Sequence, residues 1–363
     1  MSSTTDITII GAGISGLLTA REFCHAGATV TLFDKQQAGK ESSWAGGGIL
    51  LPLYPWRQSR AITQLTLQSL KLYPQLSQQL INHTNISPEL INSGLLIPKN
   101  PDIELAVTWC KQYNIDYQVA VNQQFERFNS ILENPLWLPS IQQARNPRLL
   151  KSLKQELVQN GVQFIEGSQL TALQIQQREI HQIITTSGNY PVKQLILTTG
   201  AWSGKLSEQL FPQTVLDIKP VKGQMCLFDA PVGLLKPMIL DGDKYLIPRA
   251  DGKILVGSTI ENQGFDKQTT DDARHQLQAF ATHLLPELKN HPIIHHWAGL
   301  RPATQQGIPY IACHPDFDNL AINAGHFRNG LAMGPASAQL LFELITGKST
   351  TLDATPYQLT ATH

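Results

Sequence analysis

The sequence has no excess of charge of either sign, because 28 Lys and Arg residues balance 28 Asp and Glu residues among 363 positions. A protein that binds nucleic acid usually carries a basic surplus for the phosphates, so nucleic acid is not an expected partner. The sequence also lacks an apolar run of about 18 residues that could span a membrane, and no basic and apolar leader precedes residue 6. We therefore expect a cytoplasmic protein with no membrane partner.

Cysteine is scarce and scattered, which excludes two further classes of protein. Cys24, Cys110, Cys226 and Cys313 form no C-x-x-C motif, and none belongs to a cluster of histidines. Neither a zinc site nor a disulfide framework is indicated by this spacing. We expect reduced thiols and no bound metal.

The strongest positive signal lies near the start of the chain. An apolar strand pattern at 6–10 runs directly into Gly11-Ala12-Gly13-Ile14-Ser15-Gly16, which is a G-x-G-x-x-G motif. Apolar residues at helical spacing continue to Gly27, and a second strand pattern at 28–33 ends at Asp34. A strand, glycine loop, helix, strand and terminal acid in this order are the context in which the motif binds a dinucleotide.

Each glycine of the motif has a physical task in such a unit. Gly11 makes the tight turn, Gly13 lets the backbone approach a pyrophosphate, and Gly16 lets helix and strand pack closely. The N–H groups at the start of the helix then face the phosphates with a positive partial charge. Asp34 is expected to accept hydrogen bonds from the ribose of the adenosine. The motif itself leaves NAD and FAD both open.

A second glycine-rich segment favours FAD over NAD. Residues 41–48 read Glu-Ser-Ser-Trp-Ala-Gly-Gly-Gly and continue as Ile-Leu-Leu-Pro-Leu-Tyr-Pro-Trp at 49–56. Three consecutive glycines favour neither helix nor strand, but they allow the backbone to approach a flat or charged group closely. A flexible linker is the alternative, although an apolar run rarely follows a linker. A flavin needs a second backbone-lined slot for its ring, and this segment offers one.

The next part of the chain alternates between helical and strand patterns. Amphipathic spacing predicts a helix at 61–81 that is kinked at Pro74. A second helix is predicted with Asn146 as its N-cap and Pro147 as its first residue, and Gly161 ends it. Residues 84–146 carry only short signals, including a strand at 92–98. Further strands are predicted at 162–165, 170–173, 179–186 and 192–199.

From 217 to 257 the turn signals separate short strands, which indicates an antiparallel block. The predicted strands of this block are 218–228, 238–240, 245–248 and 254–256. A helix capped by Thr270 follows and ends at 285. Further strands are predicted at 293–297 and 320–324, and a last helix at 331–345. We therefore predict that the antiparallel block is inserted into a nucleotide-binding domain. The nucleotide-binding domain would comprise 1–84, 147–214 and 299–363, and the inserted domain 85–146 and 215–298.

Four segments carry a resemblance to a known family. They are Gly11 to Gly16; Ser42 to Gly48 with Pro52 to Arg57; Ala298-Gly299-Leu300-Arg301-Pro302; and Gly325-His326-Phe327-Arg328-Asn329-Gly330. Over nearly its whole length the sequence resembles the glycine oxidase branch of the D-amino-acid oxidase family of flavoproteins. The resemblance implies an α/β fold, α+β overall, with a Rossmann-like FAD-binding domain and an inserted antiparallel-sheet domain that binds substrate.

The resemblance also implies an activity. Such an enzyme oxidises glycine, sarcosine and small D-amino acids by transferring a hydride from the substrate Cα to N5 of FAD, and O2 is the final acceptor. The products are hydrogen peroxide and an imine, which hydrolyses to glyoxylate and ammonia or supplies thiamine thiazole synthesis. A homotetramer is implied as well. Some members of the family bind FAD covalently through a cysteine near the position of Arg301, and no cysteine lies between Cys226 and Cys313 here, so the resemblance implies non-covalent FAD.

Three residues are expected to bind the substrate. Arg301 matches the family's carboxylate-binding position, and a guanidinium suits this task because its planar fork of N–H groups pairs with both carboxylate oxygens. A surface ion pair is the alternative for Arg301. Tyr245 matches a tyrosine that helps to hold the carboxylate, or it is simply an aromatic residue of the sheet. Arg328 lines the site, or it contacts the flavin or a backbone carbonyl.

No side chain is expected to act as a catalytic acid or base, because the flavin carries the chemistry. His326 is therefore not assigned as a base, and Lys222 is expected to be solvated. The pocket volume is expected to depend on Leu51, Met225 and Phe327. The start of the last helix would stabilise negative charge on the reduced flavin. The expected cofactor-binding residues are Gly11, Ala12, Gly13, Ile14, Ser15, Gly16, Asp34, Lys35, Ser42, Ser43, Ala45, Gly46, Gly47, Gly48, Leu50, Leu170, Thr199, Gly200, Trp202, Gly299, Arg301, His326, Phe327, Arg328, Asn329, Gly330 and Leu331.

Three other functions stay open. A D-amino-acid dehydrogenase that reduces a quinone would use the same cofactor, but no basic amphipathic segment is visible for membrane docking. A flavoprotein that processes a carboxymethylaminomethyl group on tRNA needs similar chemistry, but a basic surplus and a fused methyltransferase are both lacking. A non-enzymatic FAD-binding module would have no use for Arg301.

Overall fold

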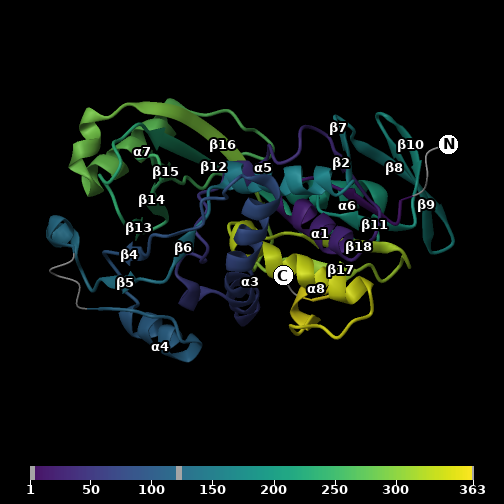
Figure 1. Cartoon of the computed structure of the whole chain (residues 1–363), viewed down its shortest axis with the longest axis horizontal. Coiled ribbons are helices and arrows are strands. Elements are labelled where there is room, and N and C mark those ends of the chain that lie inside the picture. Colours follow the sequence, from purple (N-terminus) through teal and green to yellow (C-terminus); the bar gives the residue numbers. More distant parts are fainter. Residues whose placement is uncertain (1–4, 120–124, 362–363) are drawn as a thin grey trace.

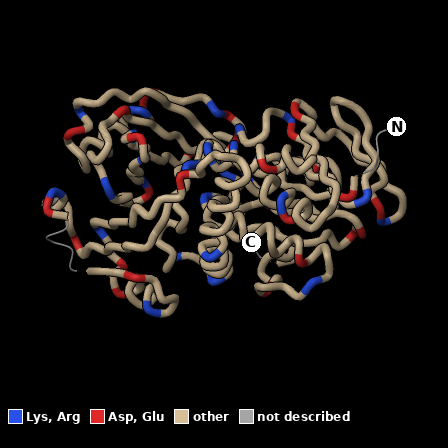
Figure 2. Tube along the Cα trace, viewed as in Figure 1, with Lys and Arg blue, Asp and Glu red and all other residues tan. Residues whose placement is uncertain are grey.

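The computed structural model describes residues 5–119 and 125–361 of the chain. Figure 1 shows an elongated molecule with a mainly parallel sheet toward one end and an antiparallel sheet toward the other; α3 (Arg60–Thr84) and α5 (Asn146–Gln159) lie between them. Acidic and basic residues are interspersed along the whole trace (Figure 2). No helix among the described residues combines the length and the apolar composition needed to cross a membrane.

The first sheet has the strand order β17-β18-β11-β1-β2-β7. The strands β1 (Ile7–Ile10), β2 (Val30–Asp34), β7 (Gln163–Glu166), β11 (Gln194–Leu197) and β18 (Leu320–Ala324) are parallel, and β17 (Tyr310–Cys313) is an antiparallel edge. The strand order reverses at β1, because β2 and β11 pair with it on opposite sides. Ligands of such sheets bind at the carboxyl ends of the strands beside this reversal, where the Gly11–Gly16 loop begins.

The two faces of this sheet are covered differently. Ile9 and Ile196 pack with α1 (Ile14–His25), α3, α5 and α8 (Gly330–Ile345) in one core. Leu195 and Leu197 face the other side and pack with residues of a three-stranded antiparallel sheet, made of β8 (Leu170–Gln176), β9 (Glu179–Thr185) and β10 (Gly188–Pro191). The central strands β1 and β11 are buried and mostly apolar, which is why they were readable in the sequence, whereas the edge strand β7 has exposed Gln163 and Glu166 at its ends.

The second sheet has the order β16-β12-β15-β14-β13-β4-β5. Its strands are β4 (Leu95–Ile97), β5 (Leu136–Leu138), β12 (Lys219–Phe228), β13 (Met238–Asp241), β14 (Lys244–Pro248), β15 (Ile254–Gly257) and β16 (Ile293–Ala303). One face packs against α7 (Asp271–Leu284), and the other against α4 (Ile103–Tyr113). All pairs are antiparallel except β13 with β4.

Several predicted elements need correction. The 84–146 region holds α4, whose 11 residues were missed because prolines at 98 and 101 precede it, together with the short pair β3 (Ile91–Asn92) and β6 (Gln142–Gln143). A further helix, α6 (Ser203–Leu210), was also missed. Helix α3 runs through Pro74 and is longer than predicted. The predicted N-cap of α7 is confirmed, because the Thr270 side chain accepts a hydrogen bond from the Ala273 N–H.

The predicted α/β fold class is confirmed, with an antiparallel sheet beside a parallel one. Every strand of the first sheet falls in the segments assigned to the nucleotide-binding domain, 1–84, 147–214 and 299–363. Strands of the second sheet fall in 85–146 and 215–298, apart from the end of β16, which continues to Ala303. The division into two domains at those boundaries stays a prediction.

Candidate functional site

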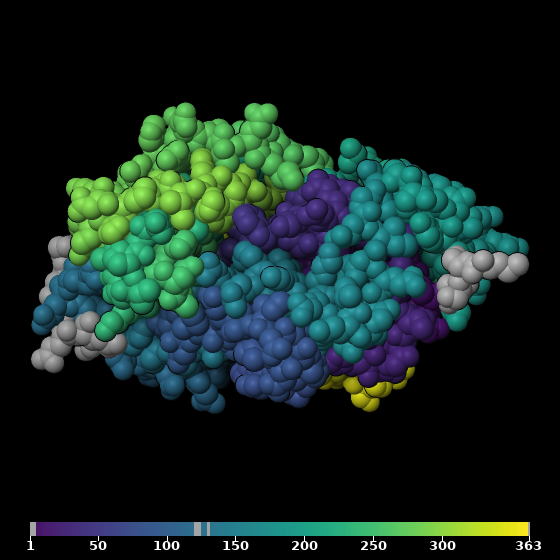
Figure 3. Space-filling view, turned by 45° about the horizontal axis from the view of Figure 1, so that its top comes forward, coloured from purple at the N-terminus to yellow at the C-terminus, as the bar shows by residue number. Residues whose placement is uncertain are grey.

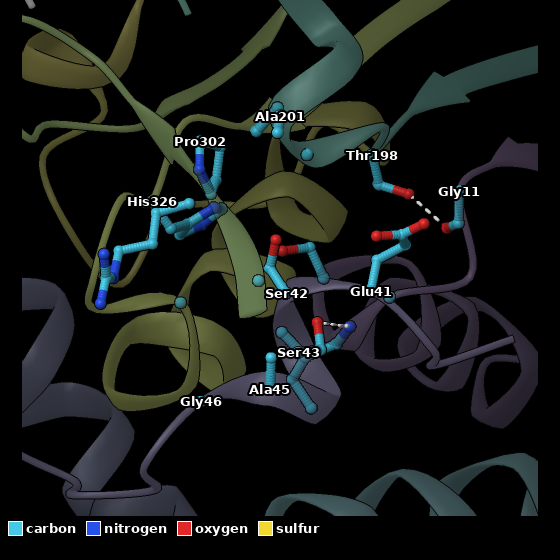
Figure 4. A pocket seen from close by; sticks show the side chains of 18 of the residues that line it. Gly11, Glu41, Ser42, Ser43, Ala45, Gly46, Thr198, Ala201, Pro302 and His326 are labelled. Carbon is cyan, nitrogen blue, oxygen red and sulfur yellow. Dashed lines mark hydrogen bonds between the residues drawn. The ribbon is translucent and has the colours of Figure 1, made fainter. Parts of the chain in front are cut away.

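A cavity of about 400 Å³ collects residues from both sheets. This volume is typical of small-molecule and cofactor sites, which span roughly 300–1,000 Å³. The cavity extends from Asp34 at the end of β2 to Tyr245 on β14 and Arg301 on β16. Figure 4 shows Gly11 and Thr198 on one side of it and Pro302 and His326 on the other. The structure thus brings together residues that are almost three hundred positions apart in the sequence.

Every predicted site residue lines this cavity except Ala12, Gly16 and Leu50. These three lie behind its wall. Ala12 and Leu50 are buried in the core, and a Cβ at Gly16 would overlap the Gly11 carbonyl, which is the close helix–strand packing expected of this glycine. The binding roles of the predicted residues stay predictions, and their convergence on one cavity supports them.

The loop after β1 owes its shape to glycine and to one carboxylate. Gly11 has φ +104°, and a Cβ there would lie 2.5 Å from the Thr198 carbonyl oxygen, so no larger residue fits. Asp34 accepts a hydrogen bond from the Ala12 N–H at 2.8 Å, and Ser43 Oγ accepts one from the Ile14 N–H at 2.9 Å. The start of α1 is therefore held toward the cavity by residues of β2 and of the second glycine segment.

The second glycine segment is fixed and is not a flexible linker. Its start forms the short helix α2 (Ser42–Ala45). Trp297 Nε1 donates to the Ala45 carbonyl at 3.1 Å, and Arg249 Nη2 donates to the Gly47 carbonyl at 2.7 Å. A Cβ at Gly47 would lie 2.8 Å from the Tyr245 ring. Glycine is required here because the backbone runs directly against that aromatic side chain.

Asn146 has a different role from the one predicted. Helix α5 begins at Asn146 itself, and the side chain forms no cap; its Nδ2 donates instead to the Ser43 carbonyl at 2.7 Å. Asn146 lines the cavity, and its buried Oδ1 has no hydrogen-bond partner among the described residues. The same is true of Asn323 Oδ1. Buried acceptors are rarely left unpaired, so the cavity wall fits a ligand that offers N–H or O–H donors, as FAD does.

Arg301 reaches the cavity from β16. Its Nη1 donates to the carbonyls of Lys222 (3.3 Å) and Thr259 (3.1 Å), and its Nη2 donates to Ser258 Oγ (2.6 Å). No ion pair joins it to a carboxylate of the described residues. Burial lowers the pKa of Arg301 to about 10, so it remains charged at neutral pH. Of its five N–H donors, Nε–H and one N–H of Nη2 have no bond to these residues and are free for an anion.

The neighbours of Arg301 on β12 explain how it is accommodated. A Cβ at Gly223 would overlap the guanidinium, so this glycine makes room for it. The prediction of a solvated Lys222 is wrong, because this lysine is 2% exposed and pairs with Asp266 (3.1 Å) and Glu261 (3.4 Å). Those acids compensate its buried charge, and no local pattern in the sequence reveals them.

Tyr245 and Arg328 also line the cavity. The Tyr245 hydroxyl donates only to Met225 Sδ, at 3.5 Å, which is a weak acceptor. It is therefore free to bind a stronger acceptor. Arg328 Nη2 donates to the Asp243 carbonyl at 3.0 Å, so the alternative of a backbone contact is the one observed for this residue. Leu51, Met225 and Phe327 line the cavity as expected.

His326 is a neutral residue of the cavity wall. Its Nε2 lies 3.0 Å from Ser337 Oγ, whose hydroxyl donates to the Met333 carbonyl at 2.8 Å. A hydroxyl has one proton, so the imidazole must donate from Nε2. Burial lowers the pKa of His326 to about 4. A histidine with this pKa is a poor base at neutral pH, which agrees with leaving it unassigned.

The last helix starts at the cavity, with Gly330 and Leu331 in its wall. No side chain caps this end, so its first N–H groups are available to a negatively charged ligand atom. Among the described residues no group of three or more His, Cys, Asp or Glu could hold a metal ion, and the four cysteines are free thiols.

Some lining residues were not predicted. They include Glu41, Asn146, Ser168, Gln169, Thr198, Lys205, Gln209, Gly223 and Asn323. They come from helices α5 and α6, from strands β12 and β18 and from loops; Glu41 begins the second glycine segment, and none of the others belongs to a motif that the sequence displays. Glu41 and Thr198 adjoin predicted residues and could have been included by proximity; the rest gave no signal.

Comparison with known proteins identifies the family. The sequence profile described as FAD dependent oxidoreductase matches residues 6–344. The chain is 39% identical to the glycine oxidase of Pseudomonas aeruginosa over 356 residues, which cover 97% of each protein. The glycine oxidase of Pseudomonas putida gives the same identity and coverage. The crystal structure of glycine oxidase from Geobacillus kaustophilus matches with a TM-score of 0.92 at 26% identity, covering 99% of each chain. The chain belongs to the FAD dependent oxidoreductase family, and FAD is its cofactor.

Proposed function

We propose that this oxidoreductase oxidises glycine and other small amines, including sarcosine and small D-amino acids, with O2 as electron acceptor. Similarity to two glycine oxidases along 97% of the chain supports this substrate class. The observation that carries the proposal is the arrangement at Arg301, a partly buried cation in the cavity with two free N–H donors and no acidic partner among the described residues. A free amino acid supplies the missing carboxylate.

In this proposal the protein binds and orients the substrate. Arg301 pairs with the carboxylate through Nε and Nη2, and the Tyr245 hydroxyl donates to the same group. Leu51, Met225 and Phe327 line the cavity and limit the size of the side chain that fits. FAD, when bound, supplies the redox chemistry by accepting the hydride. In this proposal neutral His326 takes no proton from the substrate. The substrate amine therefore loses its proton without a base supplied by this histidine.

The overall reaction balances without another co-reactant. The amine loses two electrons and two protons to give an imine, and O2 takes them up to form hydrogen peroxide. Water then hydrolyses the imine of glycine to glyoxylate and ammonia, or the imine supplies synthesis of the thiazole ring of thiamine. We further propose that the FAD is non-covalent, that the enzyme is a cytoplasmic homo-oligomer, and that the two sheets mark a cofactor-binding and a substrate-binding domain.

A peroxide assay tests the proposal. Purified enzyme is incubated with glycine, sarcosine, D-alanine and D-proline in air, and hydrogen peroxide and glyoxylate are measured. Peroxide from glycine or sarcosine at the highest kcat/KM is the expected result. Peroxide from none of them, with reduction of an added quinone, would favour the dehydrogenase. Inactivity in both assays would favour the tRNA-directed flavoprotein.

Acid precipitation of the same enzyme tests the mode of FAD attachment. Release of all the yellow colour into the supernatant is expected, because no cysteine lies between Cys226 and Cys313. Colour retained in the pellet would contradict non-covalent binding.

Light scattering during gel filtration measures the oligomeric state. A single monomeric peak would contradict the proposed homo-oligomer.

A further inference from the structure

Residues 258–270 connect β15 to α7, and we call the part at 261–270 the strap. Residues 262–270 are exposed, yet the side chains in the middle of the strap make specific contacts. Phe265 stacks on Trp202, with ring centroids 5.6 Å apart and an interplanar angle of 27°. Lys35 Nζ lies 3.1 Å from the centroid of the same tryptophan ring. Trp202 is thus held by an aromatic ring of the strap and by a lysine at the end of β2.

Two ion pairs hold the strap in place: Asp266 binds a lysine of the antiparallel half, and Lys267 binds an acid of the parallel-sheet half. Asp266 pairs with the buried Lys222 at 3.1 Å. Lys267 Nζ donates to both carboxylate oxygens of Glu41, at 3.0 and 3.1 Å. The second pair joins residues 226 positions apart, across the two halves of the molecule. In Figure 3 the green residues of the antiparallel half accordingly come up against the purple N-terminal segment.

The partners of the strap belong to the cavity wall. Trp202 and Glu41 both line the cavity, as does Lys35. Trp202 lies in a short 3-10 turn after β11, and Glu41 precedes α2, so both come from the parallel-sheet half. The strap comes from the antiparallel half. Among the described side chains, Phe265 and Lys267 make the contacts of the strap with this wall, and Lys205 of the wall also lies over the Phe265 ring, with its Nζ 5.9 Å from the centroid. Asp266 points instead to Lys222 on β12.

We propose that the strap retains FAD in the cavity. Phe265 and Lys267 hold Trp202 and Glu41 in place across the two halves, and these contacts must break before the wall can open to release a bound dinucleotide. Phe265 and Lys267 are positioning residues that act through Trp202 and Glu41. This inference rests on membership of the FAD-dependent family and is independent of which amine is oxidised.

The test measures FAD release from purified holoenzyme without any substrate. The enzyme is diluted strongly, and the return of flavin fluorescence gives the release rate. Phe265→Ala removes an aromatic pair and should accelerate release about two- to tenfold. Lys267→Ala removes an exposed ion pair and should accelerate it about 1.5- to fivefold. The double variant should show close to the product of the two factors, and Lys267→Arg should release FAD as slowly as the native enzyme.

Matched variants and salt separate retention from a general loss of stability. Phe317→Ala removes an aromatic contact with Phe211, and Lys193→Ala an exposed ion pair with Asp6, and none of these four residues lines the cavity. Both should leave release unchanged. Raising the salt concentration should accelerate release from the native enzyme and not from Lys267→Ala, because salt screens exposed pairs. Unchanged release in the double variant, or equal acceleration by the matched variants, would overturn the proposal even if glycine is oxidised as proposed.

Discussion

The antiparallel half contains two arginines with similar immediate contacts, the buried Arg249 after β14 and the partly buried Arg301 on β16. Burial lowers the pKa of each to about 10, and neither forms an ion pair with a carboxylate of the described residues. Each donates three hydrogen bonds to neutral oxygens; those of Arg249 go to Gln143 Oε1, the Ala144 carbonyl and the Gly47 carbonyl. They differ in one respect: Arg301 lines the cavity, and Arg249 does not.

This difference separates a structural cation from a binding cation. Arg249 reaches the Gly47 carbonyl from behind the cavity wall and holds the second glycine segment in place. Arg301 faces the cavity with donors to spare. A buried charge without an acidic partner is unfavourable, so each position needs a reason. Arg249 holds the cavity wall in place, and for Arg301 we propose that the reason is the carboxylate of the substrate.

The largest expected effect on catalysis is that of Arg301→Ala. Loss of a charge-assisted pair of about 1.5–3 kcal/mol should raise KM for glycine by roughly ten- to a hundredfold. Steady-state peroxide assays measure it. Arg178→Ala, which removes an arginine paired with Asp318 outside the cavity, is the matched control and should leave KM unchanged. An unchanged KM in Arg301→Ala would remove the distinction between the two arginines.

Arg249→Met should act on stability instead. It leaves the Gly47 carbonyl and Gln143 Oε1 without their donor, and about 2 kcal/mol of unfolding free energy should be lost. Urea unfolding followed by tryptophan fluorescence gives this value. The rise in KM for glycine should be much smaller than in Arg301→Ala. If Arg249→Met raised KM as strongly while keeping its stability, Arg249 would belong to the binding site as well.

His326 is a buried basic side chain that, unlike the two arginines, is neutral in the folded protein. Its folded pKa of about 4 lies below the ordinary value of 6.5, so the unfolded chain binds a proton that the folded protein excludes. Stability should therefore fall as pH falls from 6.5 toward 4, with about 1 kcal/mol lost between pH 7.5 and 5.5. His326→Gln should lack this part of the pH dependence in urea unfolding. An equal slope in both proteins would show that the imidazole is not buried in its neutral form.

Ser258→Ala should have the smallest effect. Its hydroxyl accepts from Arg301 Nη2, so its loss should leave the guanidinium less well oriented and raise KM about two- to fivefold at unchanged kcat. Ser258→Thr keeps the hydroxyl and should restore KM. Ser152→Ala removes a buried hydroxyl that donates to the Leu149 carbonyl in α5, and it should leave KM unchanged. A loss of kcat with KM unaltered would argue against a role through Arg301.

Much of the fold was predictable because its signals are local. The loop from Gly11 to Gly16 needs glycine for reasons of its own backbone, and the central parallel strands β1 and β11 are mostly apolar and buried. Helix α4 was missed because the residues around it are rich in proline, and its amphipathic pattern is short. The start of α5 was misjudged by one residue, because an asparagine before a proline is typical of a helix cap.

The site was predictable only where a motif marks it. Arg301 and the loop from Gly325 to Gly330 carry recognisable patterns, and the structure brings both to the cavity. Asn146 reaches Ser43 over 103 positions, and Lys267 reaches Glu41 over 226. Such contacts depend on how the two halves are arranged, and a pattern within one segment cannot express them. The burial of Lys222 was missed for the same reason.

The most direct test compares glycine with glycinamide, which keeps the amine and the reacting carbon but replaces the carboxylate by a neutral amide. The ratio of their kcat/KM values is measured for the native enzyme and for Arg301→Ala. The native enzyme should prefer glycine by roughly ten- to a hundredfold, and the preference should fall close to one in the variant. A preference that is the same in both proteins would contradict the assignment of Arg301 as the group that binds the substrate carboxylate.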